Sequence, residues 1–143
     1  MSDLLKHECA VALLRLRKEP AHYVKRYGTC CYGLEKATLL LEKQHNRGQD
    51  GAGLAALKLD PEPGTPAFSM EKSACAGSPL ADLLEKVAAR RQAFDNASVF
   101  LGHLRYATFG RNDVGCCSPF LHESSCLDRM LLLAGNFNLT DNR

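Results

Sequence analysis

Short apolar runs that end in polar, glycine-containing loops recur along this chain and constrain its fold more than any other feature. Most of these runs have the length of a strand rather than of a helix. We predict strands over residues 8–16, 52–59, 98–106 and 130–134, and helices, from apolar residues at helical spacing, over 32–44 and 80–94. Short strands interrupted by two helices, without the regular alternation of a parallel sheet, predict an α+β domain with largely antiparallel pairing.

The length of 143 residues corresponds to one domain. Residues 60–66 contain three prolines and a glycine, so we predict a surface loop there, inside that single domain.

With 45% hydrophobic residues, 24% charged residues and a net charge of +2, the composition is that of a globular protein. Basic and acidic residues are interleaved, which gives no stripe for nucleic acid. The apolar run near the N-terminus is too short for a signal peptide or a membrane span, which predicts a cytoplasmic protein with no membrane partner.

Seven cysteines are many for this length, but their number is odd and two pairs are adjacent, Cys30–Cys31 and Cys116–Cys117. Without a secretory signal, reduced thiols are expected rather than a disulfide framework. The adjacent pairs lack the spacing of a zinc site, and neighbouring thiols do not easily share one tetrahedral metal. We therefore predict no metal site and a structural or incidental role for these cysteines.

Four stretches carry polar or reactive groups that core packing does not explain. Three of them place such groups in a loop directly after an apolar segment, where a rigid scaffold meets a backbone free to approach a ligand. Taken singly, each could be an ordinary turn. The stretches are residues 8–10, 44–50, 102–110 and 135–140.

In this order the four stretches resemble the glutaminase domain of the amidophosphoribosyltransferases, class II glutamine amidotransferases with an N-terminal nucleophile. The likeness covers nearly the whole chain. It lies in Cys9-Ala10, in Gln44-His45-Asn46-Arg47-Gly48-Gln49-Asp50, in Gly102-His103-Leu104-Arg105-Tyr106-Ala107-Thr108-Phe109-Gly110, and in Asn136-Phe137-Asn138-Leu139-Thr140. The resemblance implies the four-layer αββα Ntn-hydrolase sandwich with antiparallel sheets, incomplete at the C-terminus, as a partial amidotransferase domain over residues 9–143.

The resemblance makes Cys9 the nucleophile, once a leader of residues 1–8 is removed. A terminal α-amino group has an unperturbed pKa of roughly 7.7–8.0 and can take the proton of the neighbouring thiol. Attack on the side-chain amide of glutamine forms an oxyanion on the way to a glutamyl thioester. By the family pattern, the side-chain amide of Asn136 and the backbone N–H of Phe137 stabilise that oxyanion.

The same resemblance implies three further substrate-binding residues. Arg105 offers a planar fork for the α-carboxylate of glutamine, Thr108 lines that pocket, and Arg47 stands near the nucleophile. His45 and His103 receive no catalytic role, since a histidine like His103 at a strand end is more often a hydrogen-bonded core residue.

The family also implies partners and cofactors. Its members use glutamine to aminate phosphoribosyl pyrophosphate in purine synthesis, and a homo-oligomer is expected for the full-length form. No cofactor is expected in this chain, because magnesium belongs to the phosphoribosyltransferase domain that follows in the family.

Departures from the family pattern leave alternatives open. Ala10 and Phe137 stand where the family has glycine, and Asn46 is an extra residue. The chain stops at Arg143, ahead of the expected acidic group for the substrate amine, so we expect a fragment, a truncated product or a chain completed by another subunit. A catalytically inactive remnant with a role in assembly is the first alternative, and an unrelated small α+β binding protein is the second.

Overall fold

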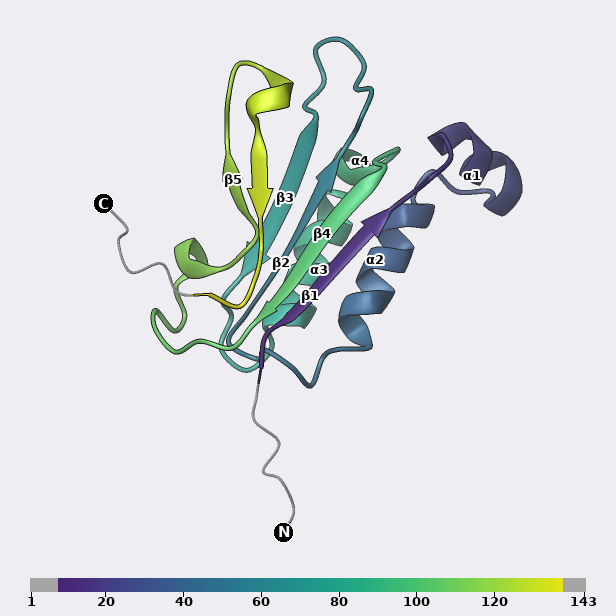
Figure 1. Ribbon diagram of the computed structural model, residues 1–143. Helices are drawn as coiled ribbons and strands as arrows, with labels where there is room; N and C mark the ends of the chain where they lie inside the picture. Colours follow the sequence, from purple (N-terminus) through teal and green to yellow (C-terminus); the bar gives the residue numbers. More distant parts are fainter. Residues whose placement is uncertain (1–7, 138–143) are drawn as a thin grey trace.

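The computed structural model describes residues 8–137, which form a mixed α/β fold with two antiparallel sheets (Figure 1). The larger sheet has the strand order β1-β4-β2-β3, and β5 pairs with β6 in the smaller one. In chain order the elements are β1 (Ala10–Arg15), α1 (Pro20–Tyr27), α2 (Tyr32–Glu42), β2 (Gly51–Leu57), β3 (Phe68–Ser73), α3 (Pro79–Ala89), α4 (Arg91–Phe94), β4 (Val99–Arg105), a 3₁₀ turn (Val114–Cys116), β5 (Phe120–His122), a 3₁₀ turn (Leu127–Arg129) and β6 (Leu131–Leu133).

One face of the larger sheet carries the helices. Helix α2 packs on β1 and β4, and α3 packs on β2 and β3. The core between the helices and the sheet contains Leu41 of α2, Leu83 of α3, and Leu54 and Phe100 of the strands. Gly33 lets α2 approach this closely, because a Cβ there would lie 2.4 Å from the ring of Phe100.

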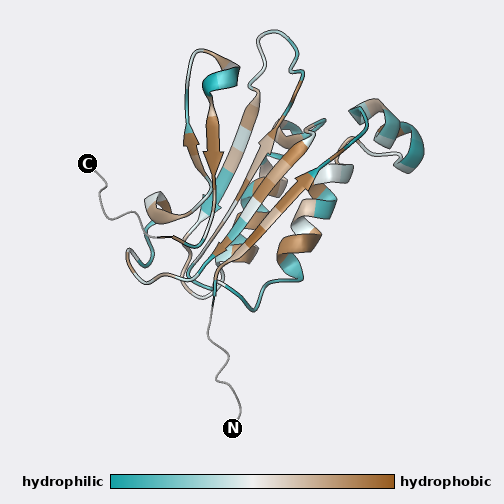
Figure 2. Cartoon of the chain, in the orientation of Figure 1, coloured by the Kyte–Doolittle hydropathy of each residue, from teal (hydrophilic) through white to brown (hydrophobic). Residues whose placement is uncertain are grey.

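The opposite face of the larger sheet is covered only in part by the β5–β6 hairpin. A Cβ at Gly53 of β2 would lie 2.2 Å from the carbonyl oxygen of Ser118, just before β5. The Nζ atom of Lys72 in β3 lies 4.8 Å from the ring centroid of Phe120 in β5. Val11 and Leu13 of β1 point to the same face and are 45% and 69% exposed. Figure 2 shows the hydrophobic residues that run along β1 and β4.

The antiparallel sheets confirm the α+β class predicted from the sequence, and each predicted strand and helix is present with slightly different ends. The predicted helix over 80–94 is broken at Arg90, and the break directs Phe94 into the core. The predicted loop at 60–66 connects β2 to β3. Among the described residues, no helix combines the length and the apolar character needed to cross a membrane.

One helix and two strands were not predicted. Helix α1 begins at Pro20, whose fixed φ suits the first helical position, and is capped after Tyr27 by Gly28 in the left-handed conformation (φ 74°). Strand β3 contains Glu71 and Lys72, and β5 has three residues, so neither shows a run of apolar residues long enough to be recognised.

Candidate functional site

The predicted nucleophile, Cys9, lies at the end of the larger sheet where β1 begins and β4 ends. The pairing of Ala10 with Leu104 places Cys9 next to the residues that close β4. The Cys9 Sγ accepts a hydrogen bond from the backbone N–H of Tyr106 at 3.3 Å and lies 3.8 Å from the Tyr106 carbonyl oxygen. The thiol is partly exposed, so the fold holds a reactive group in place and leaves it accessible.

The loop over residues 44–50 reaches the same end of the sheet. Arg47 forms an ion pair with Glu8 (Nη1 to Oε2, 3.2 Å), and both side chains are exposed. Gly48 has φ +52° and lies so close to β4 that a Cβ would come within 2.3 Å of the Leu104 carbonyl. Asp50 accepts a hydrogen bond from the backbone N–H of Ala107 at 2.9 Å. The second and third motifs are therefore joined by direct contacts.

Arg105, the predicted ligand for the substrate carboxylate, is the last residue of β4 and is 8% exposed. Its Nη1 donates to the carbonyl oxygen of Gly110 at 2.8 Å, and its Nη2 donates to that of Phe109. Thr108 lies in the loop that these bonds hold, and its side chain is exposed. Two of the five guanidinium N–H groups thus hold the loop in shape, and three N–H groups lie outside these two bonds.

His103 is buried in β4 at 2% exposure. The burial expected from the sequence is confirmed, but within residues 8–137 neither ring nitrogen has a hydrogen-bond partner. Burial lowers the pKa of His103 to about 4, the positive charge of Arg105 adds to this, and the backbone of Gly135 acts weakly in the opposite direction. His103 therefore carries a neutral imidazole, buried in β4 two residues before Arg105.

The predicted oxyanion residues follow β6. Asn136 and Phe137 are both exposed, and the Phe137 ring packs beside Gly135, where a Cβ would lie 2.8 Å from it. The backbone of Gly135 lies close enough to His103 of β4 to raise the pKa of its imidazole. The start of this motif therefore returns to the larger sheet. The rest of the motif, residues 138–140, lies outside the described residues, as do residues 1–7 of the predicted leader.

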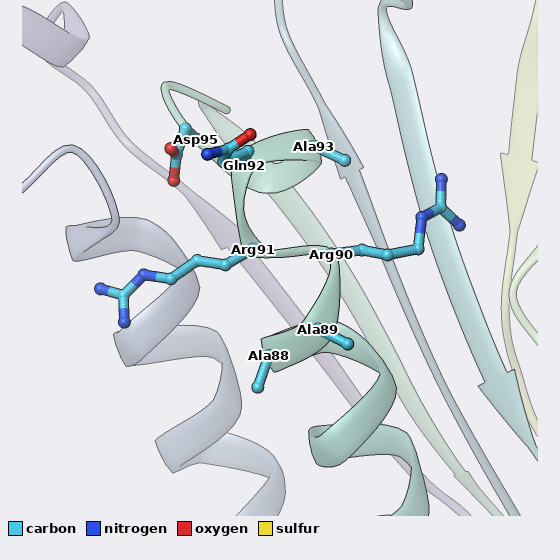
Figure 3. Close-up of a pocket in the computed structure, with 7 residues that line it drawn as sticks. All are labelled: Ala88, Ala89, Arg90, Arg91, Gln92, Ala93 and Asp95. Atoms are coloured by element: carbon cyan, nitrogen blue, oxygen red, sulfur yellow. The ribbon is translucent and has the colours of Figure 1, made fainter.

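A second cluster lies at the opposite end of the fold, where β4 begins, and was missed from the sequence. Within the described part of the chain, Cys30, Cys31 and Asp95 are the one group of three side chains placed to hold a metal ion. Beside it is an open hollow of about 590 Å³, lined by residues 88–93 and Asp95 (Figure 3). Arg90 and Arg91 point away from each other at its edge. Asp95 carries no local signal in the sequence, because only the fold brings it to the two thiols.

Comparison with known proteins gives no relative for this chain. No protein-family model, no curated protein and no solved structure matches it. The residues at the two ends of the larger sheet are therefore the basis for inferring a function.

Proposed function

We propose that the chain is the glutaminase part of an amidophosphoribosyltransferase-like enzyme with the four-layer αββα Ntn-hydrolase fold. In this proposal the helices and the larger sheet are two of the layers, and β5–β6 begins the second sheet. The glutaminase acts in the cytoplasm and supplies ammonia for the formation of phosphoribosylamine in purine synthesis. The second domain, which binds phosphoribosyl pyrophosphate with magnesium, uses that ammonia in a homo-oligomeric full-length form.

The reaction begins when removal of residues 1–8 gives Cys9 a free α-amino group. That amine takes the thiol proton, and the sulfur attacks the side-chain amide carbon of glutamine. The C–S bond forms, the C–N bond breaks, and the proton goes to the leaving ammonia. Water then cleaves the glutamyl thioester to give glutamate and restore the thiol. Asn136 and the Phe137 N–H stabilise the oxyanion in both steps, and loss of one such donor costs about 10²–10³ in rate.

The observation that carries the proposal is the meeting of three separate motifs at one end of the sheet. The Cys9 Sγ contacts the backbone of Tyr106, and the neighbouring Arg105 ends β4. Two residues of the 44–50 loop contact the same segments: Arg47 forms an ion pair with Glu8, and Asp50 accepts a hydrogen bond from the Ala107 N–H. A partly exposed thiol near two arginines suits a substrate that carries both a carboxylate and an amide, such as glutamine.

Glutamine binding assigns a role to each remaining residue of the site. In the proposal, N–H groups of Arg105 outside these two bonds bind the α-carboxylate, while two of its N–H groups keep the loop in shape. Thr108 lines the pocket from that loop. Arg47 is exposed beside the nucleophile, so it covers the bound substrate once the Glu8 carboxylate is gone.

The proposal is tested by comparing the full chain with a chain that begins at Cys9. The second chain should react with a diazoketone analogue of glutamine at Cys9 alone, and excess glutamine should protect it. It should also release ammonia from glutamine, and Cys9→Ser should abolish this release. The chain that starts at Met1 should do neither, because its Cys9 has no free amine. Labelling of Cys126, an exposed thiol, with the same protection by glutamine would contradict the assignment.

A non-catalytic role in assembly is the second candidate, and one observation favours it. Arg105 is nearly buried and already engaged with the Phe109 and Gly110 carbonyls, as in a residue that maintains a loop. Absence of both labelling and glutamine protection in the folded chain that begins at Cys9 would favour this role.

A further inference from the structure

Two adjacent thiols and a carboxylate meet at the end of the sheet away from Cys9. Cys30 and Cys31 directly precede α2, and Asp95 directly follows α4. Their ligand atoms all lie within 4.8 Å of one another. The backbone supports this meeting, because the N–H of Asn96 donates to the carbonyl of Cys30 at 3.3 Å.

We propose that Cys30, Cys31 and Asp95 bind a zinc ion that clamps the start of α2 to the segment between α4 and β4. The two Sγ atoms are 3.8 Å apart. Two sulfurs that bind one zinc at about 2.3 Å with a tetrahedral angle are separated by about 3.8 Å, so the thiols already have the required spacing. Adjacent positions in the sequence therefore do not prevent the pair from sharing a metal here.

Asp95 supplies the third ligand. Without a metal, the Cys31 thiol donates to the Asp95 Oδ1 at 2.7 Å. This bond keeps the proton on the thiol until a cation replaces it. On zinc binding both thiols release a proton to solvent, and the carboxylate oxygen moves from the sulfur to the metal. Cys30 is exposed, which leaves the fourth position open to water.

Arg91 completes the site without binding the metal. Its Nε donates to the Cys31 Sγ at 3.0 Å, and its Nη2 is held by Glu35 at 3.0 Å. An N–H group fixed against a metal-bound thiolate stabilises the charged sulfur. Two thiolates and the Asp95 carboxylate carry three negative charges against the two positive charges of zinc, and the Arg91 guanidinium, which also contacts Glu35, lies beside this excess negative charge. Thiolate ligands favour zinc over magnesium or calcium, which prefer oxygen.

The other adjacent pair provides an internal comparison. Cys116 donates to the Asp113 carboxylate at 3.3 Å, whereas Cys117 is buried and its Sγ lies 3.5 Å from the Ser73 carbonyl. In this pair one sulfur therefore meets a carboxylate, and the other meets the backbone carbonyls of Ser73 and Asp113. Because only the first pair forms part of a three-ligand cluster among residues 8–137, the second pair serves as a matched control.

The test is zinc titration of the full chain in competition with a chromophoric chelator, with a phosphine reductant present. One equivalent should bind, and both Cys30→Ser and Asp95→Asn should weaken it by at least about tenfold. Cys116→Ser should bind as the parent does. Cobalt in place of zinc should show the visible bands of a tetrahedral ion and a sulfur charge-transfer band that Cys30→Ser loses.

Stability gives a second readout that does not depend on the chelator. Saturating zinc should raise the Tm of the parent and of Cys116→Ser, but not that of Cys30→Ser. Cys30 is exposed, so this variant should fold, and circular dichroism checks that it does. Equal zinc affinity in the parent, Cys30→Ser and Asp95→Asn would overturn the proposal, as would an octahedral cobalt spectrum.

Discussion

The backbone N–H of Tyr106 donates a hydrogen bond to the Sγ of Cys9 across 3.3 Å, although the two residues are 97 positions apart. Only the antiparallel pairing of β1 with β4 brings them together. The position of the thiol thus depends on the strand register, and a slip of one residue would turn Cys9 to the other face of the sheet. The same register fixes the distance from the thiol to the loop that Arg105 holds.

Replacing Cys9 with alanine removes the acceptor for the Tyr106 N–H but little buried surface, because both residues are partly exposed. We expect the free energy of unfolding to fall by about 1 kcal/mol or less, since solvent can replace the lost partner. Urea unfolding measures this change, with Cys126→Ala as the control for an exposed thiol. A loss of several kcal/mol would assign Cys9 to the core instead.

Replacing Gly48 with alanine should disrupt the contact between the 44–50 loop and β4. Its φ of +52° disfavours a side chain, and the new Cβ would lie 2.3 Å from the Leu104 carbonyl. Gly64 is the matched control, because it also has positive φ (+81°) but no atom within 4 Å of a Cβ. We expect Gly48→Ala to lower the free energy of unfolding by on the order of 1 kcal/mol more than Gly64→Ala. Equal effects in chemical denaturation would mean that the loop does not depend on this contact.

His103 should make the fold sensitive to acid. Burial, aided by Arg105, lowers its pKa from 6.5 to about 4. As the pH falls below 6.5 the unfolded chain binds a proton that the folded chain does not, so stability decreases until about pH 4 and this contribution then levels off. The loss reaches on the order of 3 kcal/mol.

A leucine at position 103 provides the control, because it fills a similar volume and cannot titrate. His103→Leu should match or exceed the parent in stability at pH 7, since it removes two buried ring nitrogens that lack a partner among the described residues. Its stability should also vary less between pH 6.5 and 4 than that of the parent. Parallel curves for the two proteins in urea titrations would contradict the role given to His103.

The parts of the fold that could be predicted are those whose apolar residues stand together in sequence. Strand β4 and helix α2 bury one face against a common core, and their patterns show this directly. Strand β3 could not be found, because it is partly covered by the β5–β6 hairpin and keeps Glu71 and Lys72. The break at Arg90 was also hidden, since the sequence through Phe94 continues with helix-compatible residues.

At the candidate site, the sequence predicted which residues lie together but not which groups each of them contacts. The motifs around Cys9, Arg47 and Arg105 were recognisable, and the fold places them at one end of the sheet. The sequence did not show that Arg105 is engaged with its own loop, because such bonds go to backbone carbonyls that any residue provides. Likewise, the partner of Cys31 is Asp95, 64 positions away, and no local pattern links them.

Arg105→Lys tests both uses of this arginine in one variant. Lysine keeps the charge but cannot donate to Phe109, Gly110 and a substrate carboxylate in the geometry of the guanidinium fork. We expect the free energy of unfolding to fall by about 1.5–3 kcal/mol, as for the loss of one hydrogen bond to a charged group. In the chain that begins at Cys9, the glutamine concentration that protects the thiol should rise at least about tenfold for the same reason.

The control is Arg111→Lys, because Arg111 lies in the same loop, is exposed and makes a single 3.5 Å contact with Asp50. This variant should change neither stability nor protection appreciably, since exposed ion pairs contribute little. The two measurements on Arg105→Lys separate the candidate functions. If the variant is less stable but glutamine still protects its thiol as in the parent, under conditions where the variant is folded, Arg105 only stabilises its loop. This result would favour the role in assembly. Weaker protection in a folded variant would assign its remaining donors to the substrate carboxylate, because the loop bonds alone do not recognise glutamine.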